Sequence, residues 1–143
     1  PFAAGSFDAV LSFAVFEHLH NPFLAIREVS RILKPGGVFV GVVSQGEPFH
    51  ESYFHHTAWG VIALAASTGE LDVVQMWPSR DTLLALARMS RYSKVVKLSL
   101  RMLDVFNRNT PFLTPRKMRW PAKLRAIDEV NRAGSIGFVM KRR

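Results

Sequence analysis

The chain has 143 residues, of which 48% are hydrophobic, enough to bury one core and too many for a disordered segment. It has no cysteine, which excludes disulfides, thiolate nucleophiles and thiolate metal ligands. The net charge of +8 is unevenly divided, since residues 1–79 hold three basic and seven acidic residues whereas residues 80–143 hold sixteen and four. We therefore expect the basic half to form a separate layer. Its charge favours an acidic partner, or it serves only as a solvated face.

Membrane insertion is not expected from this sequence. No apolar run approaches the roughly 20 residues that a membrane-crossing helix needs, and no signal peptide is visible. We expect a soluble, cytoplasmic protein.

The first elements in chain order form one strand, helix, strand unit. Phe7–Phe13 is a nearly continuous apolar run, typical of a strand covered on both faces. Asn21 can cap a helix in which Pro22 takes the first position, and Pro35-Gly36-Gly37 is predicted to end it. Val38–Val43 is the second apolar run, so the pattern predicts two parallel strands joined by a helix.

This unit resembles the second half of a class I S-adenosylmethionine-dependent methyltransferase. The residues that carry the resemblance are Pro1-Phe2, Ser6-Phe7-Asp8-Ala9-Val10, Phe16-Glu17-His18-Leu19, Pro22, Ala25, Glu28 and Arg31-Ile32-Leu33-Lys34-Pro35-Gly36-Gly37. The resemblance implies an α/β, Rossmann-like sheet in which Phe7–Phe13 is the fourth strand and Val38–Val43 the fifth. The family's glycine-rich turn and the acidic residue after its second strand are not in this chain, so we interpret it as the C-terminal portion of such an enzyme.

The resemblance also assigns residues to the cofactor. Ligands of open α/β sheets bind beyond the carboxyl ends of the strands, so Ser12, Phe13 and Ala14 are expected to face S-adenosylmethionine. In the family, backbone groups here touch the methionine part of the cofactor. Phe2 lies in the loop that passes near the adenine, or it packs in the core.

Glu17, His18 and His20 form a polar group between the first strand and the helix. On the ligand side of the sheet, His18 is our candidate for a base that takes a proton from the methyl acceptor, with Glu17 beside it. Alternatively His18 only orients the loop. Some relatives bind a divalent cation through an E-x-x-E-H motif, but Ala14 stands where the first glutamate would be, so no metal site is predicted.

The segment after the second strand is rich in histidine and aromatic residues. We expect a substrate wall containing His20, His50, Tyr53, His55 and Trp59. Histidines at 50, 55 and 56 could in principle hold zinc, but neighbouring side chains point apart on a helix. One of His55 and His56 should therefore face the pocket and the other should face solvent.

The remaining pattern predicts a helix over Trp59–Ser67, ended by Gly69, and a strand over Leu71–Trp77, closed by Pro78. Arg80–Phe106 follows as a long amphipathic helix with a basic face. A short helix over Ala122–Ala133, ended by Gly134, and a final antiparallel strand over Ser135–Lys141 complete the chain. The predicted domains are a methyltransferase core over 1–79, a helical cap inserted over 80–134, and a last core strand over 135–143.

The basic segment over 88–108 has two interpretations. It can cover the active site as a lid, which we prefer, or lie on an anionic lipid surface. Nucleic acid is not expected as a partner, because Trp120 is the only aromatic residue in the basic run over 116–121.

Together the residues and the resemblance predict methyl transfer from S-adenosylmethionine to an oxygen or nitrogen of a small molecule, within a longer enzyme. The alternative is a non-catalytic module that acts through its basic helix on an anionic membrane, a nucleic acid or a protein. Steep salt dependence of binding to vesicles or RNA, in a chain that ignores the cofactor, would favour this alternative.

Overall fold

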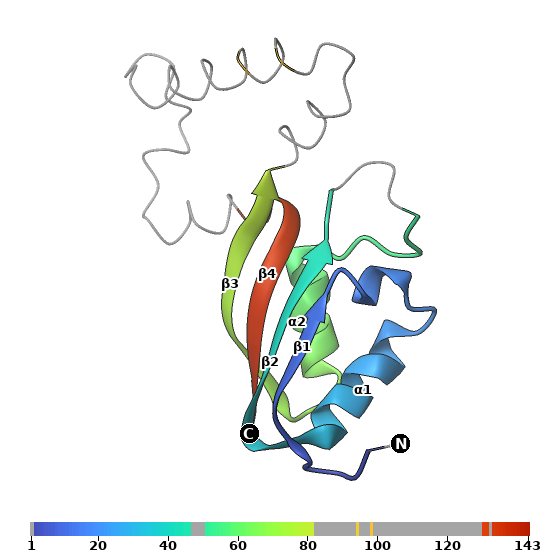
Figure 1. Cartoon of the computed structure of the whole chain (residues 1–143), viewed down its shortest axis with the longest axis vertical. Coiled ribbons are helices and arrows are strands. Elements are labelled where there is room, and N and C mark those ends of the chain that lie inside the picture. The colour runs from blue at the N-terminus through green and yellow to red at the C-terminus, as the bar shows by residue number, and fades with distance from the viewer. Residues whose placement is uncertain (1, 47–50, 82–93, 95–97, 99–129, 132) are drawn as a thin grey trace.

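The computed structural model describes residues 2–46, 51–81, 94, 98, 130–131 and 133–143 (Figure 1). These residues form a mixed four-stranded sheet with helices packed against it. No helix among them is long and apolar enough to cross a membrane. In chain order the elements are β1 (Phe7–Phe13), η1, a 3-10 helix (Phe16–His18), α1 (Pro22–Ile32), β2 (Leu33–Ser44), α2 (Ala58–Ala66), β3 (Leu71–Asp81) and β4 (Ala133–Arg142).

The predicted strand, helix, strand unit is confirmed by β1, α1 and β2. Asn21 caps α1, since its side-chain oxygen accepts a hydrogen bond from the backbone N–H of Leu24 at 3.0 Å, and Pro22 takes the first helical position. β1 and β2 pair in parallel, with Val10 opposite Phe39. The two strands therefore end at the same edge of the sheet.

The predicted end of α1 and start of β2 are wrong. The helix stops at Ile32, because Leu33 is already extended, with φ −69° and ψ 143°. Lys34 also precedes a proline, which disfavours helical backbone. Pro35-Gly36-Gly37 belongs instead to the irregular first part of β2, where Gly36 has a φ of +79°. Pairing passes from Phe7 opposite Leu33 to Ala9 opposite Val38 across this irregularity.

The second helix and third strand agree with the sequence except at their ends. α2 begins at Ala58, because the Thr57 hydroxyl accepts a hydrogen bond from the Gly60 N–H at 3.1 Å. β3 runs on to Asp81, so the prediction that Pro78 closes the strand is wrong. In the order β1-β2-β4-β3 this strand lies at an edge, where a proline that lacks an N–H need not interrupt the sheet.

The final strand, β4, is confirmed as antiparallel, and it lies between β2 and β3. It begins at Ala133, so Ala133 and Gly134 are not the end of a helix as predicted, although Val130 and Asn131 are helical. The predicted helical cap falls mostly outside the described residues. Lys94 and Leu98 are described there, and both are helical and exposed.

The core lies on one side of the sheet. Ile26 of α1 and Val61 and Leu64 of α2 pack against Phe39 of β2 and Phe138 of β4. Gly41 leaves space for Phe138, because a Cβ at that position would collide with its ring. Both helices therefore cover the same face of the sheet (Figure 1).

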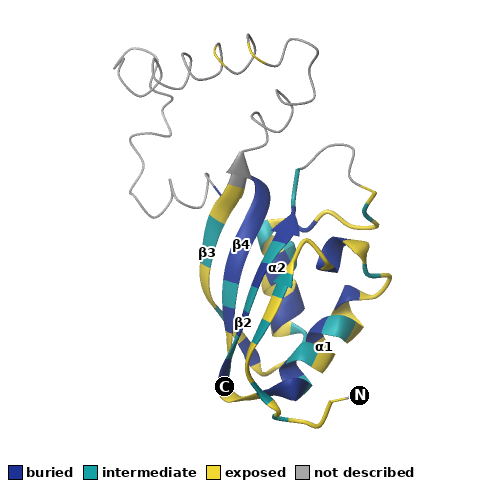
Figure 2. Cartoon of the chain, in the orientation of Figure 1, coloured by how far each residue is buried: buried dark blue, intermediate teal, exposed yellow. Residues whose placement is uncertain are grey.

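The other face is less covered in the part of the chain that the structure describes (Figure 2). Leu11 and Phe13 of β1 are 64% and 59% exposed, and β1 pairs with β2 alone among the described strands. The expectation that β1 is covered on both faces is therefore wrong for these residues. An apolar edge strand with open backbone groups is a surface on which other chains can pair.

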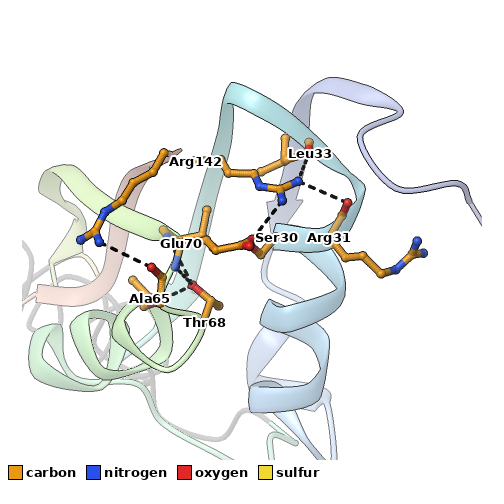
Figure 3. A network of polar contacts seen from close by, with 10 residues as sticks. Ser30, Arg31, Leu33, Ala65, Thr68, Glu70 and Arg142 are labelled. Carbon is orange, nitrogen blue, oxygen red and sulfur yellow. Dashed lines mark hydrogen bonds and ion pairs between the residues drawn. The ribbon is translucent and has the colours of Figure 1, made fainter.

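A polar network fastens the amino end of the parallel strands (Figure 3). The Arg142 guanidinium donates through Nη1 to the carbonyls of Leu33 and, at 3.4 Å, of Arg31, where α1 ends. Its Nη2 lies 3.1 Å from Glu70 Oε2, which also accepts a hydrogen bond from the Ser30 hydroxyl at 2.8 Å. Arg142 thus joins β4 to the end of α1 and to the turn before β3.

Candidate functional site

The candidate site lies at the carboxyl ends of β1 and β2, the edge at which open α/β sheets bind ligands. The chain leaves β1 through Ala14, whose N–H donates to the Val42 carbonyl at 2.9 Å. Ala14 has a φ of +52°, a left-handed conformation that costs a residue with a Cβ roughly 1–2 kcal/mol. Strain of this kind gathers at functional sites, and here it turns the backbone sharply from β1 toward η1.

The helix η1 carries Glu17 and His18, which point in different directions. Glu17 is only 1% exposed, whereas His18 is exposed. The Glu17 Oε1 accepts a hydrogen bond from the Ser44 N–H at 3.2 Å. The predicted pair is therefore divided between the interior and the surface, and only His18 faces solvent.

Residues 51–57 pack against η1 and the end of β2. The Glu17 carbonyl accepts the N–H groups of Tyr53 and Phe54 at 2.8 and 3.1 Å, and the Ser44 carbonyl accepts the N–H of His56 at 2.8 Å. His18 Nδ1 lies 2.8 Å from the Glu51 carbonyl oxygen. These bonds bring the segment after β2 alongside the segment after β1.

Two predicted substrate residues meet on this surface. The rings of His20 and Tyr53 stack, with centroids 4.3 Å apart and planes 26° apart. Tyr53 is 61% exposed, so the stacked pair remains open to a ligand. His18, His20 and Tyr53 thus form one wall at the carboxyl edge.

The other predicted site residues lie apart from this wall or outside the described residues. His55 is exposed, and Trp59 is 71% exposed on the first turn of α2. His50 lies outside the described residues. Phe2 packs edge-on against Phe7 at the amino end of β1, with centroids 5.0 Å apart, so the structure does not bring it to Ser12, Phe13 and Ala14. The functional roles of all these residues stay predictions.

Sequence reasoning missed the interior of the site. His56 and Ser44 are buried together with Glu17, and each of these three side chains has one polar atom that finds no hydrogen-bond partner within the described part of the chain. Burial lowers the pKa of the His56 imidazole below its ordinary value, although the Phe16 carbonyl and the Glu17 carboxylate act in the opposite direction. The sequence indicates only that one of these two adjacent histidines faces solvent. In the structure His55 is the exposed one and His56 is buried.

Other polar groups do not add a second site. Within the described ranges, no group of three His, Asp or Glu side chains could hold a metal ion. A cavity of about 220 Å³ lies at the opposite, amino end of the strands, beside the network of Figure 3. Its Arg31 and Arg142 guanidinium groups already bind Glu28 and Glu70, so we interpret this cavity as a structural junction.

Comparison with known proteins gives three findings. Residues 1–41 match the family model described as "Methyltransferase domain". The chain is 45% identical over 53 residues to the uncharacterized protein YafE of Escherichia coli (strain K12), a match that covers 36% of this chain and 26% of that protein. The third finding is a likeness to solved structures.

Two crystal structures illustrate this likeness. The cyclase SpnF has a TM-score of 0.54 and 16% identity, over 99% of this chain and 51% of that chain. Phosphoethanolamine N-methyltransferase 2 of Haemonchus contortus, in complex with S-adenosyl-L-methionine, has a TM-score of 0.52 and 19% identity, over 100% of this chain and 34% of that chain. At these identities the likeness establishes the fold alone. The chain spans about half the length of SpnF. It spans a smaller share of the methyltransferase and of YafE.

Proposed function

We propose that this chain is a portion of a class I S-adenosylmethionine-dependent methyltransferase domain and takes part in methyl transfer within a longer enzyme, a proposal supported by the family match over residues 1–41. The methyl group comes from S-adenosylmethionine, and the acceptor is an oxygen or nitrogen of a small molecule. The observation that carries the proposal is the wall of His18, His20 and Tyr53 at the carboxyl edge of β1 and β2. This edge is where the fold binds its ligands.

The cofactor would lie against the end of β1. Ser12, Phe13 and Ala14 are the residues we assign to it, and the positive φ of Ala14 supports this assignment because it sets the backbone direction where the strand ends. When bound, S-adenosylmethionine supplies a methyl group on a positively charged sulfur. The chain lacks the family's glycine-rich turn, so we expect the rest of the cofactor to be held by other residues of the longer enzyme.

His18 is our candidate base for an acceptor that must lose a proton. A carbonyl oxygen can only accept, so the contact with Glu51 requires the proton of the neutral ring to be on Nδ1. The lone pair is then on Nε2, which is the form that a base needs. Such a base assists the reaction only at a protonated oxygen or nitrogen, because the transfer itself depends mainly on positioning.

The acceptor would meet the stacked pair of His20 and Tyr53. An aromatic surface with two polar edges suits a small molecule that has both flat and hydrogen-bonding parts. His50, His55 and Trp59 extend this proposal along the segment that leads into α2.

Binding of the cofactor tests the proposal first. Calorimetry with S-adenosylmethionine and its demethylated product should show binding to a longer polypeptide that joins this chain to a glycine-rich N-terminal half. We expect weak or no binding to residues 1–143 alone. Absence of binding in both forms would overturn the proposed function.

The role of His18 needs a separate measurement. His18→Ala in the longer enzyme should lower kcat and leave the affinity for the cofactor unchanged, because the proton acceptor is lost and the cofactor contacts are kept. Val74→Ala is the control, since this side chain is 62% exposed on β3 and is not assigned to the site. Equal rates for His18→Ala and the unchanged enzyme would remove the base from the proposal.

A second candidate function concerns residues 88–108. Residues 80–143 hold twelve more basic than acidic residues, and the described positions Lys94 and Leu98 present a cation and an apolar side chain to solvent. We propose an anionic lipid surface as the partner of this segment. Binding to vesicles rich in anionic lipid, lost at high salt and absent with neutral vesicles, is the expected result. Equal binding to both kinds of vesicle would contradict it.

A further inference from the structure

The buried carboxylate of Glu17 is difficult to explain as packing. Removing a charged group from water is costly unless the group is paired or well hydrogen-bonded. Here Oε1 accepts one bond, from the Ser44 N–H at 3.2 Å, and Oε2 has no hydrogen-bond partner among the described residues. An apolar side chain would fill this space at a lower cost, so the carboxylate must contribute something other than stability.

The contacts of Glu17 show what it holds together. Its side chain binds Ser44 at the end of β2, and its carbonyl binds the N–H groups of Tyr53 and Phe54. Ser44 in turn binds the N–H of His56 through its own carbonyl, at 2.8 Å. Glu17 and Ser44 therefore fasten residues 53–56 at both ends, and the bond between them connects the two attachments.

The fastened segment supports the rings of the candidate wall. Tyr53 stacks on His20 with ring centroids 4.3 Å apart, and the carbonyl oxygen of Glu51 accepts a hydrogen bond from His18 Nδ1, which lies 2.8 Å away. The Tyr53 N–H donates a hydrogen bond to the Glu17 carbonyl, and Glu51 lies two residues before Tyr53 in the chain. The wall therefore lies beside a segment that is hydrogen-bonded to the main chain of Glu17, the residue whose buried side chain accepts the Ser44 N–H.

We propose that Glu17 is a positioning residue, which anchors η1 to the end of β2 and thereby holds the wall of His18, His20 and Tyr53 in place. The proposal rests on the proposed function for what the wall does, but the anchoring itself can be tested without cofactor or substrate. It differs from the sequence-based expectation that Glu17 acts beside His18 as a catalytic group. A residue that is 1% exposed acts on a ligand only through its neighbours.

Amide hydrogen exchange of the natural chain, measured by NMR, is the first test. If Glu17 anchors the segment, the amides of Ser44, Tyr53 and Phe54 open together as one unit, before the sheet opens. Exchange of Tyr53 and Phe54 at unprotected rates while Ser44 stays protected would overturn the proposal. The proposal would also be overturned if the three amides exchanged only when the whole sheet opens.

Two variants of Glu17 give the second test. Glu17→Ala removes the acceptor of the Ser44 N–H, and should lower the protection of the Tyr53 and Phe54 amides by at least about tenfold. Glu17→Ala should also remove the ring-current change that Tyr53 causes in the NMR chemical shifts of the His20 ring hydrogens. Glu17→Gln keeps an oxygen acceptor and should preserve both signals. The sheet amides of Val40 and Val139, which pair in β2 and β4, should keep their protection in both variants.

His55→Ala is the matched control, because it alters an exposed side chain on the same segment and should change neither signal. Unchanged protection of Tyr53 and Phe54 in Glu17→Ala would refute the proposal. An equal loss of amide protection in the sheet and in residues 53–54 would show that Glu17 only stabilises the whole fold. That result would also refute the proposal. If Glu17→Ala does not fold, exchange of the natural chain decides alone. Failure of cofactor binding would leave these results unaffected, so the two proposals can fail separately.

Discussion

Arg142 is expected to contribute much more to stability than its neighbour Arg143. Both are arginines near the end of β4, and each pairs with a carboxylate. Arg142 also donates to the Leu33 and Arg31 carbonyls at the end of α1, and 19% of its side chain is exposed. Arg143 pairs with Asp72 at 2.6 Å, but 67% of its side chain is exposed. The two therefore form a matched comparison.

The expected loss for Arg142→Met follows from these contacts. The bond to the Leu33 carbonyl is charge-assisted and partly buried, and such a bond contributes about 2 kcal/mol to the free energy of unfolding. The bond to the Arg31 carbonyl is long, at 3.4 Å, and the ion pair reaches a half-exposed Glu70, so both add little. We expect Arg142→Met to lose about 2 kcal/mol.

Urea unfolding, followed by tryptophan fluorescence and circular dichroism, is the assay. Coincident transitions by the two probes would justify a two-state free energy. Arg143→Met should unfold close to the unchanged chain, because an exposed pair is screened by water. Equal losses for the two variants would refute the reasoning, since it assigns the difference to the carbonyls at the end of α1.

The other predictions concern separate features. Asn21→Ala should cost about 1 kcal/mol in the same urea assay, because the cap of α1 is lost; no change would show that the cap is dispensable. The lowered pKa of His56 means that the unfolded chain binds the proton more readily. Stability should therefore fall as the pH drops below about 6.5, and His56→Gln should weaken that dependence; an equal slope would contradict burial of a neutral ring. Leu11→Lys should reduce self-association in analytical ultracentrifugation, because it places a charge on the exposed edge strand; Leu24→Lys, which places the same charge on an exposed position of α1, is the control.

The first third of the fold could be predicted from the sequence because its signals are local. Asn21, Pro22 and the two apolar runs act within a few residues of themselves, and the structure confirms the helix between two strands. The resemblance to the methyltransferase family is likewise confirmed by the match over residues 1–41. The errors occur where distant residues decide. β2 starts early because Leu33 pairs with Phe7, and β3 passes Pro78 because the strand is at an edge.

The candidate site was predicted only in outline for the same reason. His18, His20 and Tyr53 were expected near the carboxyl edge, and the structure brings them together there. Nothing in the sequence around Glu17 indicates that its side chain is buried, because its anchor, Ser44, is 27 positions away. A pattern of residue types places polar groups near a site, but packing determines which of them reach the surface.

The position of β4 determines when the sheet can form. β4 lies between β2 and β3, yet it follows β3 in the chain after a separation that runs from Asp81 to Ala133. At about 5–20 residues per second, a ribosome needs roughly 3–10 s to make the residues between the two strands. Pairing strands that lie so far apart in the sequence also slows folding. During synthesis, β2 and β3 are therefore complete before the strand that joins them exists. A chain interrupted within this interval would leave the apolar side chains of both strands exposed to chaperones and proteases.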